Sequence, residues 1–213
     1  MVERDYFYID KTEFIRQWWE RGDSATLINR PRRFGKTLNM SMLEQFFSVE
    51  YAGRSNLFVK FSYLKDSEKL TDTDRAFFNR MLSEQGRDSD ATSSLYQLSS
   101  FLNRYYGKKV IILLDEYDTP MQEAYADDYW EKIVPFTRSL FNSTFKNNPY
   151  MERGMMTGIT TISKESIFSD LNNLKVITTT SEEYADAFGF TEQEVFQALD
   201  EFHMAGERET VKL

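Results

Sequence analysis

Apolar positions along the chain follow two patterns, short continuous runs and helical spacings. Continuous runs predict strands at residues 25–29 and 110–114, because a strand covered on both faces is apolar along its whole length. Three further stretches predict strands at residues 59–63, 153–159 and 175–180. These strands are spread along the chain, so long connections must join them.

Between these stretches, apolar residues recur three and four positions apart, a spacing typical of amphipathic helices. In residues 10–22, for example, Phe14, Ile15, Trp18 and Trp19 form one apolar face. The other predicted helices cover residues 36–49, 72–84, 93–106, 128–146 and 192–204.

Local residues add detail to this arrangement. Pro135 is expected to kink the helix over residues 128–146. Thr191 begins the sequence Thr-Glu-Gln-Glu, a capping box that opens the last helix. The polar residues 85–94 are expected to form an exposed loop. Because strands alternate with helices, we predict an α/β fold with a mostly parallel central sheet and helices on both faces.

Composition narrows the possible chemistry. The chain has 213 residues, of which 41% are hydrophobic, enough for one α/β domain with a substantial core. The chain has no cysteine, which excludes disulfides and thiolate metal sites. Its one histidine, His203, is expected on the surface of the last helix, which argues against mechanisms that need a histidine base.

The net charge and the length of the apolar runs indicate which partners and which cellular location to expect for the protein. The net charge of -8 argues against a nonspecific nucleic-acid binder. The longest apolar run, residues 110–114, is too short to span a bilayer, and the first residues lack the basic-then-apolar pattern of a signal segment. We therefore expect a cytoplasmic protein without a membrane partner.

A basic loop separates the strand at residues 25–29 from the helix that follows. Its sequence, RPRRFGKT over residues 30–37, ends as a phosphate-binding loop does, although Arg30 stands where the pattern G-x-x-x-x-G-K-[ST] has its first glycine. A helix N-terminus attracts phosphate, Lys36 would reach the β- and γ-phosphates, and Thr37 would offer its hydroxyl to Mg²⁺. The alternative is a basic loop that only caps a helix.

A second motif follows the predicted central strand. Residues 110–118, VIILLDEYD, have the Walker B pattern of aliphatic residues followed by two carboxylates. Asp115 is expected to hold Mg²⁺ through water, and Glu116 to polarise the attacking water. A strand that runs into an acidic turn is common, so this motif alone is weak. The two motifs in this order together favour a P-loop NTPase.

A third candidate lies in residues 155–161, MMTGITT. In AAA-type ATPases, a polar residue on the strand beside the Walker B strand senses the γ-phosphate. Thr157 or Thr160 could take this role, and the alternative is that both are ordinary strand residues.

Six stretches of the chain together resemble the bacterial AAA-ATPase-like family. They are YFYIDKTEFI, RPRRFGKT, LLDEYDTPM, TRSLFNSTFKNNPYMERGMMTGIT, SKESIFSDLNNLKV and FGFTEQEVFQALDEF. The resemblance covers nearly the whole chain and implies an AAA+/STAND-like core over residues 1–190. It implies that residues 191–213 begin a C-terminal helical lid region, that Arg30 is a family feature, and that ATP is the nucleotide.

The resemblance also implies a role for the residues before the first helix, which match the family's entry motif and are expected near the nucleotide. The predicted nucleotide-binding residues are Asp10, Lys11, Thr12, Arg30, Pro31, Arg32, Arg33, Phe34, Gly35, Lys36, Thr37 and Leu38, the catalytic residues are Lys36, Glu116 and Thr157, and the metal ligands are Thr37 and Asp115.

The chain departs from the family pattern in three places. Residues 57–70 are shorter than the corresponding region of relatives, and Thr161 stands where many relatives carry arginine. The chain ends at Leu213, before the rest of the lid and before the PD-(D/E)XK nuclease-like domain that relatives often carry.

Several functions fit these observations. The first is a Mg²⁺-dependent ATPase whose hydrolysis drives a conformational change. The second is a STAND-like nucleotide-dependent switch with little hydrolysis. A nucleic-acid-associated ATPase that acts with a downstream effector or nuclease-like domain is a third, and a small-molecule P-loop kinase is a weaker fourth. The arginines at 30, 32 and 33 would contact nucleotide, nucleic-acid phosphates, or Asp118 or Glu123.

Overall fold

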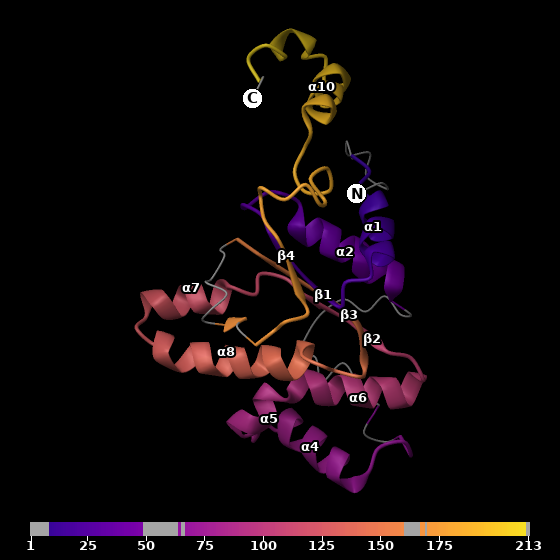
Figure 1. Cartoon of the computed structure of the whole chain (residues 1–213), viewed down its shortest axis with the longest axis vertical. Coiled ribbons are helices and arrows are strands. Elements are labelled where there is room, and N and C mark those ends of the chain that lie inside the picture. Colours follow the sequence, from indigo (N-terminus) through magenta and orange to yellow (C-terminus); the bar gives the residue numbers. More distant parts are fainter. Residues whose placement is uncertain (1–8, 49–63, 65–66, 160–166, 169, 212–213) are drawn as a thin grey trace.

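Four parallel strands form the sheet of the protein (Figure 1). The computed structural model describes residues 9–48, 64, 67–159, 167–168 and 170–211. The strands are β1 (Ala25–Asn29), β2 (Val110–Leu114), β3 (Met151–Gly158) and β4 (Leu174–Ile177), in the order β2-β3-β1-β4. The first two predicted strands are confirmed with the expected bounds, but β2, predicted as a central strand, lies at an edge of the described sheet and is half-buried. The predicted strand at residues 59–63 lies outside the described residues.

The register of β3 aligns the ends of its two neighbours. Met156 of β3 lies beside Leu27 of β1 on one side and beside Leu114 of β2 on the other. The next residue of β3, Thr157, pairs with Ile28. Because all these strands run in the same direction, the segments that leave β1 and β2 emerge at the same edge of the sheet.

The helices agree with most of the predictions from the sequence, and the differences in this part of the chain lie between residues 119 and 130. The helix expected over residues 128–146 begins at residue 130 and contains Pro135, and another helix precedes it at residues 119–126, which the sequence analysis missed. The described helices are α1 (Glu13–Arg21), α2 (Lys36–Phe47), α4 (Asp72–Leu82), α5 (Asp88–Thr92), α6 (Ser94–Tyr106), α7 (Thr119–Ala126), α8 (Trp130–Phe145) and α10 (Glu192–Glu201), followed by the 3₁₀ turn η3 (Ala205–Glu207).

The prediction of an exposed loop at residues 85–94 is confirmed for residues 85–87 but was wrong for the rest, where α5 forms and α6 begins. Asp90 is buried, accepts a hydrogen bond from the backbone N–H of Arg87, and forms an ion pair with Arg80 at 3.0 Å. This carboxylate caps the start of α5, so a polar stretch without apolar periodicity still forms a short helix.

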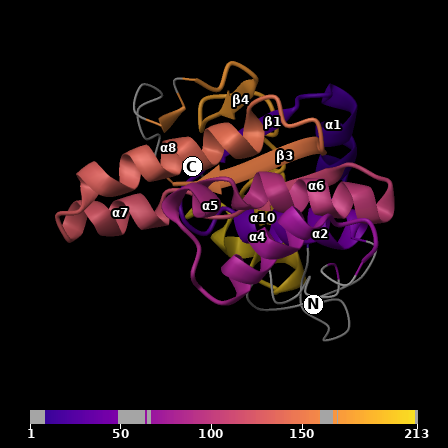
Figure 2. The same ribbon diagram turned by 90° about the horizontal axis from the view of Figure 1, so that it is seen from below.

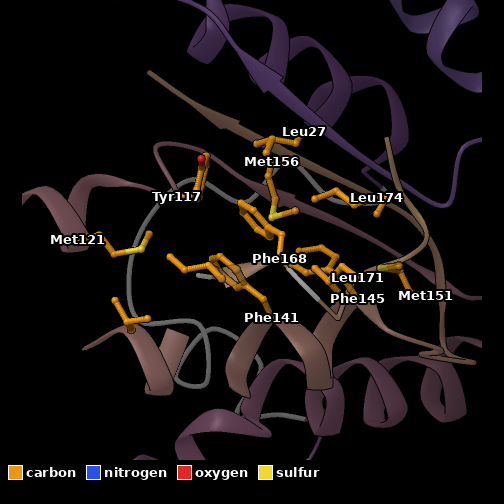
Figure 3. Packing of buried hydrophobic residues seen from close by; sticks show 13 residues of the cluster. Leu27, Tyr117, Met121, Phe141, Phe145, Met151, Met156, Phe168, Leu171 and Leu174 are labelled. Atoms are coloured by element: carbon orange, nitrogen blue, oxygen red, sulfur yellow. The ribbon is translucent and has the colours of Figure 1, made fainter. Parts of the chain in front are cut away.

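Helices cover both faces of the sheet, as expected. On one face, Leu27 and Met156 pack with Phe141 and Phe145 of α8, and the stacked rings of Phe141 and Phe168 have centroids 5.7 Å apart (Figure 3). On the other face, the alternate strand residues pack against α1 and α2. That second cluster contains Phe14, Trp18, Ile28, Met40, Leu43, Met155 and Ile177.

Two parts of the chain lie away from these faces. Helices α4, α5 and α6 group beside α8, with a small core of their own that includes Phe78 and Phe101 (Figures 1 and 2). Helix α10 buries none of its residues and lies beyond α1 and α2, away from the sheet (Figure 1). His203, just after α10, is exposed as predicted. Within the described ranges, no helix is both long and apolar enough to cross a membrane.

The close approach of α8 to β3 gives a prediction for stability. A Cβ atom added at Gly154 would lie 2.8 Å from Cε1 of the fully buried Phe145 ring. We expect Gly154→Ala to lower the free energy of unfolding in urea by about 1–3 kcal/mol, because a packed aromatic ring must move. Gly206→Ala is the matched control, since no atom lies within 4 Å of its new methyl group. Equal stability of the two variants would contradict this packing.

Candidate functional site

A loop between β1 and α2 forms one side of a pocket at the carboxyl edge of the sheet. Gly35 is the N-cap of α2 and has φ 72°, a left-handed conformation that glycine adopts without strain. Arg33 also has a positive φ of 69°. These two conformations turn the chain sharply before the helix, so the first backbone N–H groups of α2 are directed toward the pocket edge.

Lys36 is held back against its own loop. Its side chain is 7% exposed, and Nζ donates hydrogen bonds to the carbonyl oxygens of Arg30 at 3.0 Å and Pro31 at 2.9 Å. Carbonyl dipoles only partly compensate a buried ammonium group. An anion at the N-terminus of α2 would therefore be a stronger partner for Lys36 than these carbonyls are.

Asp115 joins the three segments that meet at this edge. Its Oδ2 accepts a hydrogen bond from Thr37 Oγ1 at 2.6 Å, which links β2 to the start of α2. Its Oδ1 accepts from Thr157 Oγ1 of β3 and from the backbone N–H of Glu116, the latter at 3.1 Å. The structure thus brings together the residues that the sequence assigned to the metal and to γ-phosphate sensing. Their roles stay predictions.

Glu116 has an uncommon backbone conformation. Its φ is 54°, and its backbone N–H donates to Asp115 Oδ1 and to Thr157 Oγ1, the latter at 3.4 Å. A left-handed conformation costs a non-glycine residue energy, and such residues concentrate at functional sites. The side chain is exposed and lines a pocket of about 450 Å³. The lining residues are Arg32, Arg33, Gly35, Lys36, Thr37, Leu38, Glu116, Thr119 and Ile159.

The three arginines of the loop have different surroundings. Arg32 and Arg33 are exposed and line this pocket. Arg30 is 4% exposed, and its Nη1 donates to the carbonyl oxygen of Thr178 at the end of β4. Burial lowers the pKa of Arg30 below its ordinary value. Asp118, a partner considered from the sequence, accepts from Gln122 Nε2 and from a backbone N–H of the chain after β3.

The predicted entry residues lie before α1 and bind other parts of the chain. Asp10 Oδ1 accepts from the backbone N–H of Thr12 at 2.8 Å. Lys11 Nζ donates to the carbonyl oxygen of Asp186 and to both carboxylate oxygens of Glu194, at 2.6 and 2.8 Å. Lys11 thus links α10 and its preceding segment to the residues before α1, and none of the three lines the pocket described above.

The segment before α10 also contacts the loop, through residues that the sequence analysis missed. Gly189 donates its backbone N–H to the carbonyl oxygen of Phe34 at 3.1 Å, and Asn39 Nδ2 donates to the carbonyl oxygen of Ala187 at 2.7 Å. Asn39 is a buried polar residue beside Met40 and Leu43 on the inward face of α2, a pattern that could have marked it in the sequence. Thr160, the alternative to Thr157, lies outside the described residues.

The oxygen atoms at this edge fit a divalent cation of the magnesium type. Mg²⁺ prefers one or two protein oxygen ligands and completes its shell with water and phosphate oxygens. Thr37, which lines the pocket, and Asp115, which accepts a hydrogen bond from the Thr37 hydroxyl, supply such oxygens side by side. No cluster of three or more His, Cys, Asp or Glu side chains exists in the described part of the chain, so a site with only protein ligands is not formed there.

Comparison with known proteins adds independent information. A family model described as "Predicted AAA-ATPase" matches residues 1–78 and 65–168. The "Uncharacterized protein in vnfD 5'region" of Azotobacter chroococcum mcd 1 is 26% identical over 216 residues, which cover 90% of this chain and 41% of that relative. The chain therefore spans less than half the length of this relative. No solved structure matches the chain.

The backbone of Glu116 allows a test of strain at the site. We expect Glu116→Gly to raise the free energy of unfolding in urea by up to about 1 kcal/mol, because glycine adopts a positive φ freely. Glu123→Gly, at an exposed position inside α7, is the matched control and should lower it by about 1 kcal/mol. A loss of stability in both variants would show that Glu116 carries no backbone strain.

The ion pair that attaches α10 allows a pH test. Burial favours a raised pKa for Glu194, but hydrogen bonds from Lys11 and Thr191 outweigh it and hold the pKa below the ordinary glutamate value of 4.5. The pair therefore contributes stability above pH 4.5 and loses it as the pH falls through the lowered pKa. We expect Lys11→Met to raise the ¹³C NMR titration midpoint of the Glu194 carboxyl group. Arg16→Met, on the exposed face of α1, should leave it unchanged, and an unmoved midpoint in Lys11→Met would refute the pairing.

Proposed function

The chain belongs to the family described as "Predicted AAA-ATPase", and from this premise we propose that it binds ATP with Mg²⁺ at the pocket between β1, β2 and α2 and hydrolyses it. The observation that carries the proposal is the 2.6 Å hydrogen bond between Thr37 and Asp115. It joins the end of the RPRRFGKT loop to the acidic pair after β2, across 78 residues of chain. The strand order, with β3 between these two segments, also supports a P-loop NTPase core.

The loop would act as the Walker A motif. The backbone N–H groups at the start of α2 and the cationic Lys36 would bind the β- and γ-phosphates. Lys36 Nζ, which contacts the carbonyls of Arg30 and Pro31, would exchange these partners for an anion bound beside the loop. Arg32 and Arg33 line the same pocket and add positive charge for a highly charged ligand.

Thr37 and Asp115 would hold the metal ion, Thr37 through its hydroxyl and Asp115 through its carboxylate. Bound Mg²⁺ supplies charge neutralisation at the β- and γ-phosphate oxygens. Thr157 is fully buried and donates to Asp115, which supports a positioning role through that carboxylate. Direct sensing of the γ-phosphate by Thr157, expected from the sequence, stays a prediction.

Glu116 is the proposed general base. Its exposed carboxylate lines the pocket, and its backbone is fixed by hydrogen bonds to Asp115 and Thr157. It would orient a water molecule toward the γ-phosphorus and accept a proton from it, so that the products are ADP and inorganic phosphate. Lys36 would stabilise the negative charge that develops on the transferred group.

A second candidate function is a nucleotide-controlled switch with little hydrolysis. The observation that favours it is the pair of contacts from the loop and α2 to the segment before α10, Gly189 to Phe34 and Asn39 to Ala187. A ligand that changes the position of the loop would bias the position of α10 through these contacts. This candidate requires binding of ATP but not turnover, so one pair of measurements separates the two.

Two variants test the proposed site. We expect Lys36→Ala to abolish measurable Mg-ATP binding in calorimetry, because the buried cation is lost, whereas Lys132→Ala on the exposed face of α8 should bind normally. Glu116→Gln should bind Mg-ATP as the wild type does but release phosphate at least ~100-fold more slowly. Binding without turnover in the wild type would select the switch, and unchanged binding in Lys36→Ala would reject both functions.

A further inference from the structure

Arg30 uses three of its groups to connect the start of the loop to its surroundings. Its backbone N–H donates to the carbonyl oxygen of Gly158 at the end of β3, at 3.2 Å. Its guanidinium Nη1 donates to the carbonyl oxygen of Thr178, the first residue after β4. Its own carbonyl oxygen accepts from Lys36 Nζ at 3.0 Å. Arg30 thus connects β3 and β4, the strands on either side of β1, to its own carbonyl oxygen, which binds Lys36.

The end of the loop is attached to the same segment as its start. Thr178 begins the segment that leads from β4 to α10, and Gly189 lies near the end of that segment. The Gly189 N–H donates to the Phe34 carbonyl, and a Cβ at Gly189 would lie 2.8 Å from Cδ1 of the Phe34 ring. The ring therefore packs directly on the backbone of this segment, and residues 178–189 hold the loop at both ends.

We propose that Arg30 is a positioning residue of the nucleotide site, which fixes the loop and the acceptor of Lys36 by anchoring the loop to the end of β4. The proposal rests on the proposed function and assigns Arg30 no contact with phosphate. Burial to 4% exposure separates this guanidinium from Arg32 and Arg33, which are exposed and line the pocket. A guanidinium held in a buried, directional hydrogen bond restrains the backbone that carries it.

A glycine at position 30, as in the standard phosphate-binding pattern, would keep the backbone hydrogen bonds to Gly158 and from Lys36. It would lose the side-chain hydrogen bond to Thr178. The backbone N–H and carbonyl of residue 30 do not depend on its side chain, whereas the link to Thr178 does. Glycine would also give the unfolded and unbound loop more backbone freedom. Arg30→Gly is therefore expected to loosen the loop.

Hydrogen exchange of the nucleotide-free protein tests the anchor without relying on ATP binding. We expect the amides of Asn39 and Gly189, which donate hydrogen bonds to the loop carbonyls of Gly35 and Phe34, to exchange about tenfold faster in Arg30→Met and in Arg30→Gly, because one partly buried charged hydrogen bond is lost. Arg16→Met, which removes an exposed arginine of α1, should leave these amides unchanged. Unchanged exchange in folded Arg30→Met would overturn the proposal, whether or not the wild type binds nucleotide.

Affinities for Mg-ATP and Mg-ADP separate positioning from phosphate contact. A positioning residue affects both ligands alike, so we expect Arg30→Met to weaken both about tenfold with the same salt dependence as the wild type. A phosphate contact would weaken ATP more than ADP and would make the salt dependence shallower, which would overturn the proposal. If the wild type binds neither ligand, the proposed function fails while the exchange result still decides the role of Arg30 in the loop.

Ser181 provides a second, milder variant in case Arg30→Met does not fold. Its Oγ accepts from the backbone N–H of Thr178 at 2.9 Å and so orients the turn whose carbonyl binds Arg30. We expect Ser181→Ala to raise exchange of the Asn39 and Gly189 amides about threefold, because one neutral hydrogen bond is lost. No change in this folded variant would also count against the anchor.

Discussion

The alignment of β1 and β2 across β3 is the constraint on which the candidate site depends. Leu27 and Leu114 lie on opposite sides of Met156, so the loop after β1 and the carboxylates after β2 reach the sheet edge at the same level. A shift of one residue would turn each strand side chain to the other face. Met155 and Met156 belong to different cores on the two faces, and this double packing holds the register. Core packing therefore determines whether Thr37 and Asp115 meet.

The site itself is locally unfavourable, and the rest of the fold must compensate for it. Arg33 and Glu116 have positive φ angles without being glycine, and Lys36 is a buried cation with carbonyl partners. Arg32 and Arg33 add two more positive charges around the same pocket. A polyphosphate would relieve this concentration of charge, and its binding would then raise stability through the same residues.

The sequence predicted the parts of the fold that depend on local pattern. Continuous apolar runs located both β1, which is buried along its whole length, and β2, which is only half-buried, and the order of the two motifs brought Thr37 and Asp115 into one site. Helix α5 was missed because a carboxylate cap, rather than an apolar face, stabilises it. The partner of Lys11 lies 183 residues away and that of Arg30 lies 148 residues away, and no local pattern identifies such partners.

The long-range contacts also explain what Arg30 does at the position where the standard loop has its first glycine. A glycine there gives freedom to a backbone that must turn, whereas Arg30 gives the same backbone a fixed attachment to β4. The segment that receives this attachment continues to Gly189, which binds the other end of the loop, and then to α10, which Lys11 holds through Glu194. The loop cannot shift without moving this segment or breaking its hydrogen bonds. Restraint of the loop and attachment of α10 are therefore two effects of one set of contacts.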